Sequence, residues 1–182
     1  MSPKPYLLYK SCVSNDIGGV RKALKKSFFS SATDVNERIP IVGENEEGNY
    51  PIHLAAKNGN TAIVKLLIEA GANVHIYNDL NENPFQLAAR SGNVELGDLL
   101  LSNGIDMYEH KGVSSEPIFI ALENENIAFA DFLLEKGLKL ESGFLGLRNW
   151  MIDNNKPKSL KWLLEKGKAF GFRPDDLDVS GK

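Results

Sequence analysis

Apolar residues recur at helical spacing in short stretches along the chain. Two stretches have the same pattern of positions, which are Ile63, Leu66 and Leu67 in one and Leu96, Leu99 and Leu100 in the other. Residues at i, i+3 and i+4 lie on one face of an α-helix, so each stretch predicts an amphipathic helix. Each is preceded by a polar segment containing a glycine and is followed by another glycine. Glycine in these places is typical of the left-handed turn that ends a helix.

Three landmarks recur along the chain at one constant interval of about 33 residues, a length typical of tandem helical repeats. The first is a proline that precedes a short apolar segment, at Pro51, Pro84 and Pro117. The second is a closing glycine, at Gly71, Gly104 and Gly137. The third is an apolar triplet, at residues 66–68, 99–101 and 132–134. Three landmarks in one register over three units indicate a tandem repeat.

Each unit predicts two helices joined by a turn. The proline suits the first turn of the first helix, where its missing N–H needs no partner and its fixed φ is helical. The alanine pairs that follow, such as Ala55-Ala56, allow neighbouring helices to approach closely. One helix pair of this size cannot bury its apolar faces alone. Stacked pairs can, so the repeat predicts a solenoid.

The amino-acid sequence of the units resembles the ankyrin repeat. Residues 50–59 read Tyr-Pro-Ile-His-Leu-Ala-Ala-Lys-Asn-Gly, and residues 71–74 read Gly-Ala-Asn-Val. The resemblance implies an all-α ankyrin-repeat solenoid of helix–turn–helix units with short β-hairpin loops. Tyr50 and Asn83 depart from the threonine of the family pattern, and Glu125 stands where the inter-helix glycine would be. Asn81 replaces a hairpin glycine, and asparagine tolerates the left-handed conformation needed there.

We expect about five repeats, with divergent copies at both ends, because a terminal repeat has one face in water. The middle repeats are predicted at 45–77, at 78–110 and, in divergent form, at 111–141. A divergent N-terminal capping repeat and its connecting loop occupy 1–44. A C-terminal capping repeat occupies 142–169, and an acidic tail occupies 170–182.

Composition and charge narrow the classes of partner. The 182 residues are 42% hydrophobic and carry a formal net charge of -3, which suits one globular domain and disfavours nucleic-acid binding. The basic group at residues 21–26 is followed by the acidic residues Glu44, Glu46 and Glu47, and we interpret it as a solvated helix face. No apolar run approaches the roughly 18 residues of a membrane span, so we expect no membrane partner.

Residue types that carry chemistry are few and scattered. The single cysteine, Cys12, cannot form an internal disulfide and is expected to be a buried thiol in a reducing compartment. The family resemblance gives His53 a structural hydrogen-bonding role. His75 and His110 have no Cys or His three or four residues away that would chelate a metal with them. We therefore predict no catalytic residue, no metal and no cofactor.

The resemblance also implies where a partner would bind, because ankyrin proteins generally use the concave side formed by hairpin tips and first helices. The residues that the register places there are Glu47, Asn49, Lys57, Asn58, Tyr77, Asp79, Leu80, Glu82, Arg90, Ser91, His110 and Val113. Tyr77 and His110 are one period apart, as are Leu80 and Val113, so they would form adjacent rows. Aromatic and apolar groups among polar neighbours are typical of interface hot spots. The alternative for Tyr77 is packing against its own hairpin.

The sequence thus predicts a non-enzymatic scaffold or adaptor that binds one protein partner, whose identity the sequence does not give. A regulatory or inhibitory subunit of an enzyme complex, and a self-associating structural protein, are the alternatives. The second alternative would use the aromatic C-terminal residues, which otherwise close the solenoid end and are Phe144, Trp150, Trp162, Phe170 and Phe172. We expect a monomer in the cytoplasm. A nuclear location and delivery into a host cell as a bacterial effector both stay open.

Overall fold

The computed structural model describes residues 3–25, 33–38, 49–109, 116–139 and 145–167 of the chain. These ranges contain ten helices and no strand. In chain order the helices are α1 (Pro3–Val13), α2 (Ile17–Leu24), α3 (Pro51–Lys57), α4 (Thr61–Glu69), α5 (Pro84–Ser91), α6 (Val94–Ser102), α7 (Pro117–Glu123), α8 (Ile127–Glu135), α9 (Leu145–Asp153) and α10 (Pro157–Lys166).

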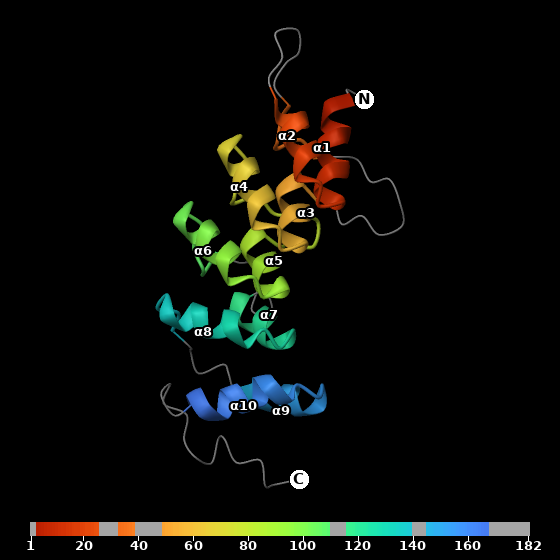
Figure 1. Ribbon diagram of the computed structural model, residues 1–182. Helices are drawn as coiled ribbons and strands as arrows, with labels where there is room; N and C mark the ends of the chain where they lie inside the picture. The colour runs from red at the N-terminus through yellow and green to blue at the C-terminus, as the bar shows by residue number, and fades with distance from the viewer. Residues whose placement is uncertain (1–2, 26–32, 39–48, 110–115, 140–144, 168–182) are drawn as a thin grey trace.

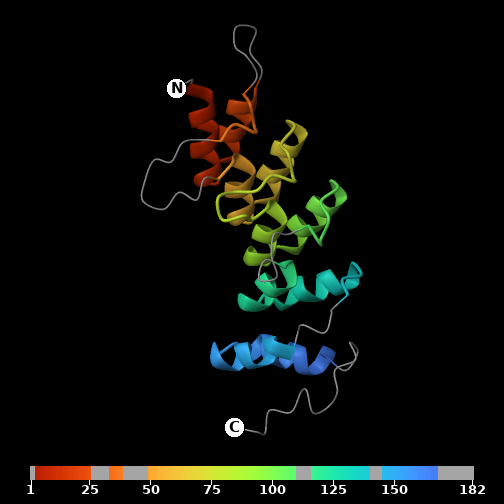
Figure 2. The same ribbon diagram turned by 180° about the vertical axis from the view of Figure 1, so that it is seen from behind.

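Consecutive helices form antiparallel pairs that stack into a solenoid (Figure 1). The first helices α1, α3, α5 and α7 pack successively in one row, and α2, α4, α6, α8 and α10 pack in the other. The first and last pairs lie at opposite ends of the stack, as the reverse view also shows (Figure 2). The predicted all-α repeat solenoid is confirmed. The loops that join the pairs are built from turns in the described part of the chain.

The landmarks of the sequence mark the ends of the helices. Pro51, Pro84 and Pro117 each stand at the start of a first helix, as predicted. Asn60 and Asn93 stand just before the second helices α4 and α6, and their side chains accept hydrogen bonds from backbone N–H groups in the first turn at 3.1 and 3.0 Å. Such capping satisfies donors that the helix itself cannot.

A left-handed residue separates the two helices of every pair. These residues are Asn15, Gly59, Gly92, Glu125 and Asn155, with φ between 53° and 71°. These left-handed residues serve to align the five pairs with one another. The number of residues from one to the next is constant across the three middle pairs, larger between the first and second pairs and smaller between the fourth and fifth. Glu125 therefore takes the conformation of the glycine that it replaces. Asn81 likewise has a φ of 58°, as its place in the hairpin predicted.

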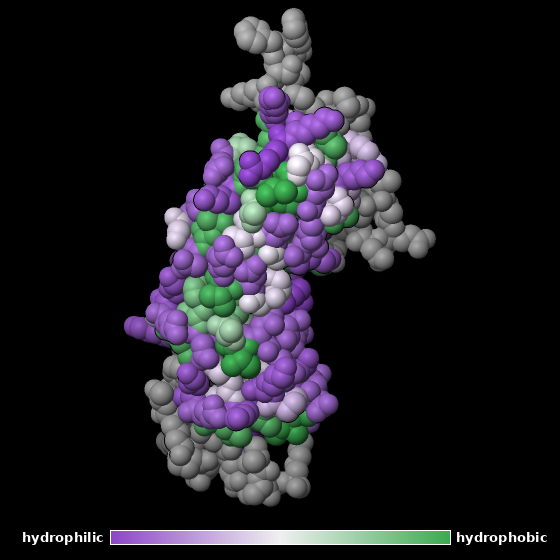
Figure 3. Space-filling model, in the orientation of Figure 1, coloured by the Kyte–Doolittle hydropathy of each residue, from purple (hydrophilic) through white to green (hydrophobic). Residues whose placement is uncertain are grey.

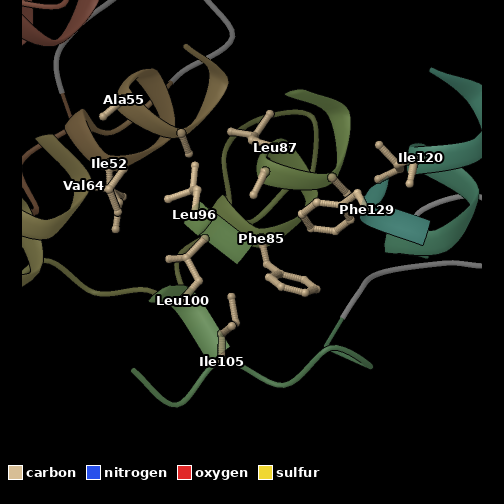
Figure 4. Close-up of a cluster of buried hydrophobic side chains, with 14 of the residues drawn as sticks. Ile52, Ala55, Val64, Phe85, Leu87, Leu96, Leu100, Ile105, Ile120 and Phe129 are labelled. Atoms are coloured by element: carbon tan, nitrogen blue, oxygen red, sulfur yellow. The ribbon is translucent and has the colours of Figure 1, made fainter. Parts of the chain in front are cut away.

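The core runs without interruption from pair to pair (Figure 4). Phe129 of α8 shows how it is built, because its ring centroid lies 5.7 Å from that of Phe85 in the preceding pair. It also lies 5.3 Å from that of Phe132 in its own helix. Gly97 of α6 leaves room for these rings, since a Cβ there would lie 2.8 Å from Phe129. Each pair therefore completes the core of its neighbour, as expected in a repeat protein.

Side-chain hydrogen bonds also join the pairs. Asn58 Nδ2 donates to two carbonyls at the end of α1, at 3.1 and 3.2 Å. Asn126 Nδ2 donates to two carbonyls at the end of α5, at 3.0 and 2.8 Å. Ser159 Oγ donates to the carbonyl of Leu122 in α7 at 2.6 Å. Carbonyls in the last turn of a helix lack intrahelical partners, so these contacts satisfy them while fixing adjacent units together.

Candidate functional site

The turn between α4 and α5 is organised around one side chain, that of Asn78. Its Oδ1 accepts hydrogen bonds from the backbone N–H groups of Leu80 at 3.0 Å and Glu82 at 2.9 Å. Its Nδ2 donates to Oδ1 of Asn49 at 3.0 Å. Its backbone N–H donates to the carbonyl of Glu82 at 3.0 Å, and its carbonyl accepts from Asn81 at 3.0 Å. Asn78 is 5% exposed, so the turn is held by buried and satisfied polar groups.

Leu80 stands at the tip of this turn with its side chain in solvent. It is 56% exposed, the largest value among the exposed large apolar side chains of the described residues. The contacts of Asn78 with position 80 use only its backbone N–H, so the leucine side chain does not hold the turn. The sequence predicted Leu80 at a binding surface. The structure places it in solvent, on a turn that the hydrogen bonds of Asn78 close.

Ion pairs flank Leu80 on both sides along the chain. Asp79 pairs with Arg38, and both side chains are about half exposed. Glu82 pairs with Arg90 at the end of α5. The side chain of Glu82 is only 10% exposed while that of Arg90 is 42% exposed, so the arginine is the accessible member of that pair. The structure thus brings four of the predicted residues together in one region, which are Asp79, Leu80, Glu82 and Arg90.

The ends of the first helices carry the remaining polar members of the predicted surface. Lys57 and Arg90 occupy equivalent positions in α3 and α5, and both are exposed. Asn58 and Ser91 follow them and are also exposed. However, Asn58 Nδ2 is occupied by the carbonyls at the end of α1, and Ser91 Oγ donates to the carbonyl of Ala88 at 3.1 Å. Asn58 and Ser91 therefore use these groups to complete helix ends.

Tyr77 lies beside the following loop. It is half-buried, and its burial together with the negative charge of Glu109 raises its pKa. Oε2 of Glu109 lies 2.7 Å from Nδ1 of His75. The backbone carbonyl of Glu109 accepts a hydrogen bond from Nδ2 of Asn83 at 2.7 Å. This arrangement supports the reading in which Tyr77 packs among hairpin neighbours while keeping part of its ring accessible.

Four of the predicted residues contribute differently or cannot be placed. Asn49 is 9% exposed and is the buried partner of Asn78, so its side chain supports the turn. Glu47, His110 and Val113 lie outside the described residues. The predicted rows that pair Tyr77 with His110 and Leu80 with Val113 therefore stay predictions.

The residues that could suggest chemistry have structural surroundings. His53 is fully buried, its Nδ1 accepts from the backbone N–H of Tyr50 at 3.3 Å, and its Nε2 lies 3.1 Å from the carbonyl of Ile76. Burial lowers the pKa of His53 to about 4, against the opposing effect of its contacts with backbone carbonyls. Burial raises the pKa of the Cys12 thiol to about 12. Cys12 is thus the buried cysteine that the sequence predicted.

No group of three or more His, Cys, Asp or Glu side chains that could hold a metal ion occurs within the described ranges. In the same part of the chain, no helix is both long enough and apolar enough to cross a membrane.

At the C-terminal end, the aromatic residues that the structure describes belong to the packing of the last pair. Trp162 is 3% exposed, and its Nε1 donates to Oδ1 of Asp131 at 2.9 Å. Trp150 is partly buried against the core. Trp162 therefore closes the last pair against α8. Phe144, Phe170 and Phe172 lie outside the described residues.

Comparison with known proteins agrees with this architecture. The family model described as ankyrin repeats, in three copies, matches residues 20–111, which is half of the chain. The chain belongs to the ankyrin-repeat family. A putative ankyrin repeat protein of Rickettsia bellii (strain RML369-C) is 33% identical over an aligned segment covering 36% of this chain. The segment spans a third of the relative's own length.

Ankyrin repeats are generally protein–protein interaction modules, and the family is typically non-enzymatic. The face of this ankyrin solenoid seen in Figure 3 is mostly polar, with separate small apolar areas. The sequence reasoning selected Leu80 by register but missed Asn78, which fixes it. An asparagine two residues before the tip is a signature of a turn closed by its side chain, so a search for such turns would have found it.

Proposed function

We propose that this ankyrin-repeat protein is a non-enzymatic interaction module that binds a protein partner through its concave face of loop tips and first-helix ends. The single observation that carries the proposal is Leu80, an apolar side chain 56% exposed at the tip of a turn closed by Asn78. The turn forms without that side chain. Its apolar surface is therefore available for burial against a partner.

The hydrogen bonds that close the turn favour binding. Ordering a side chain and its loop on binding opposes association by about 0.5–1.5 kcal/mol for each immobilised side chain. Asn78 already holds the backbone on both sides of Leu80, so little of that ordering remains to be done. A pre-organised apolar anchor can therefore contribute most of its burial to affinity.

The groups around Leu80 suit the rim of an interface. Arg90 is the accessible member of its pair with Glu82, and arginine is enriched in interface hot spots. Tyr77 is half-buried and presents an amphipathic ring close to the same loop. Asp79 and Arg38 neutralise one another beside the anchor. We infer an apolar centre surrounded by polar groups, which is the usual anatomy of an interface.

The test uses a photo-reactive amino acid at position 80 and, as a matched control, at position 65. Lys65 is exposed on α4, in the other row of helices. On irradiation in cells that produce the protein, position 80 is expected to cross-link one defined protein, and position 65 is not. The Leu80→Ser variant, with an unchanged melting temperature, should lose that partner.

The outcome decides between the proposal and its alternatives. Equal cross-linking at both positions, or a partner retained by Leu80→Ser, would contradict binding through this face. A cross-link to a second copy of the chain would instead favour the self-associating structural protein. A cross-linked enzyme whose activity changes on binding would identify the module as a regulatory or inhibitory subunit.

A further inference from the structure

The first helix pair has a charge opposite to that of the rest of the chain. Residues 3–25 contain five Lys or Arg residues and one Asp, a net charge of +4. The whole chain carries -3, so the other residues together carry -7. Lys10, Arg21, Lys22 and Lys25 are all exposed. The single acid, Asp16, accepts a hydrogen bond from the N–H of Gly19 as the cap of α2. The basic groups thus form a positive end of the solenoid.

Exposed apolar side chains gather at the same end. Five large apolar side chains are exposed in the described residues, and three of them belong to the first pair. They are Tyr6 at 53%, Val13 at 49% and Ile17 at 37%. Tyr6, Lys10 and Val13 follow one another at i, i+4 and i+7, so they form one stripe along α1. We call Tyr6, Lys10 and Val13 of this stripe the N-terminal face.

The register shows that this face differs from a simple polar cap. When the helix pairs are aligned on their left-handed residues, Lys10 corresponds to Leu87 and Ile120. These two residues lie inside the stack and are 1% and 3% exposed. A lysine there is what an end unit needs, because its side chain meets water. Val13 departs from that logic. The positions aligned with it carry charged residues in all four other pairs, which are Lys57, Arg90, Glu123 and Asp153.

We propose that the N-terminal face binds an acidic amphipathic helix of a protein partner. The stripe presents apolar, basic and apolar groups in that order, with Tyr6 and Val13 about 10 Å apart along the axis of α1. A complementary helix carries a carboxylate with one apolar side chain on each side of it. Each apolar side chain lies one or two helical turns from the carboxylate. The apolar contacts supply affinity, and the positive end of the solenoid attracts and orients the acidic helix.

Two other occupants fit the face less well. In a two-fold antiparallel pairing of α1 with α1 of a second copy, centred on the stripe, Lys10 would lie against its own counterpart, and like charges repel. A membrane surface would need a continuous apolar helix face. In α1 the apolar Leu8 and Cys12 are 1% and 0% exposed and face the core, which leaves only the ends of the stripe apolar.

The test is a selection of displayed helical peptides against the full chain, each peptide long enough for about four helical turns. We expect enrichment of peptides with Glu or Asp between two apolar residues. An enriched peptide should bind at least tenfold more weakly to Lys10→Glu and to Val13→Ser. It should also bind the native chain more weakly in about 0.5 M than in about 0.05 M NaCl, because salt screens the charges. Lys65→Glu makes the same charge change on α4 and should leave affinity unaltered.

Lys10, Val13 and Lys65 are exposed, so each variant is expected to keep the native melting temperature. This is measured before binding. Failure to enrich acidic peptides, or binding that is indifferent to Lys10→Glu, overturns the proposal. The proposal is also overturned if the native chain sediments with vesicles of mixed phosphatidylcholine and phosphatidylserine and Lys10→Glu does not. That result would assign the face to a membrane. A dimer dispersed by Val13→Ser would assign it to a second copy. None of these results depends on Leu80, so the proposed function is tested separately.

Discussion

The buried histidine of the second helix pair makes stability depend on pH in a way that one substitution should remove. His53 is 0% exposed, and burial lowers its pKa from an ordinary value near 6.5 to about 4. The folded protein therefore keeps His53 neutral where the unfolded chain protonates it. The unfolded state binds more protons between pH 6.5 and 4, so the free energy of unfolding falls as the pH is lowered through this window.

The size of the effect follows from the two values. A gap of this width corresponds to about 3 kcal/mol in full, and about 2 kcal/mol of it is lost between pH 7.5 and pH 5. Gln86 occupies the equivalent position in α5, and its Oε1 accepts the backbone N–H of Asn83 at 2.7 Å. His53→Gln should therefore keep the hydrogen bond to Tyr50 while removing the titrating ring.

Urea unfolding at pH 7.5 and pH 5, followed by circular dichroism, measures the difference. The native chain is expected to lose about 2 kcal/mol more than His53→Gln over this interval. His75→Gln is the control, because it makes the same substitution at a histidine that is exposed. Burial opposes the shift of Asp131, but hydrogen bonds from Trp162 and Lys166 lower its pKa, so its effect falls below this interval. Equal losses in the native chain and in His53→Gln would refute the reasoning.

Three further predictions concern packing, reactivity and the turn. Gly97→Ala should lower the free energy of unfolding by about 1–3 kcal/mol in urea, because the new methyl group meets the ring of Phe129. Gly18→Ala, at an exposed position of α2 where a Cβ would lie 3.3 Å from Oδ1 of Asp16, should cause a smaller loss. Cys12 should react with a thiol reagent only at the rate of unfolding, since its thiol is buried with a pKa of about 12. Fast labelling of the folded protein would contradict this. Asn78→Ala should cost about 2–3 kcal/mol in the same urea assay, because it leaves buried polar groups unsatisfied. A change within experimental error would show that the turn does not depend on this side chain.

Much of the fold can be predicted from the sequence because the repeat signals are local. Proline at the first turn, apolar residues at i, i+3 and i+4, and a left-handed residue between helices each act over a few positions. Asn81 has the left-handed conformation predicted for it, and Glu125, which was noted only as a departure from the inter-helix glycine, has it as well. Cys12 is buried, as predicted, and His53 makes hydrogen bonds of the structural kind that the family resemblance implied.

The candidate site was predictable as a region and not as a set of roles. Leu80 and Arg90 lie exposed where the register placed them. Glu82 and Asn49 were expected at the surface, yet they are 8% and 9% exposed. Both residues contact the side chain of Asn78, which accepts the backbone N–H of Glu82 and donates to Asn49 across 29 residues of sequence.

The sequence by itself determined the period, the helix pairs and the residues that close each turn, because these depend on backbone preferences and on the spacing of apolar side chains. Only the tertiary structure decided which polar residues are available to a partner. Asn58 is an example, because its amide is taken up by carbonyls of the preceding pair, 45 and 46 residues away. Hydrogen-bond partners at such separations are set by how the pairs stack. The same stacking leaves the side chain of Leu80 in solvent, where it is accessible to a partner.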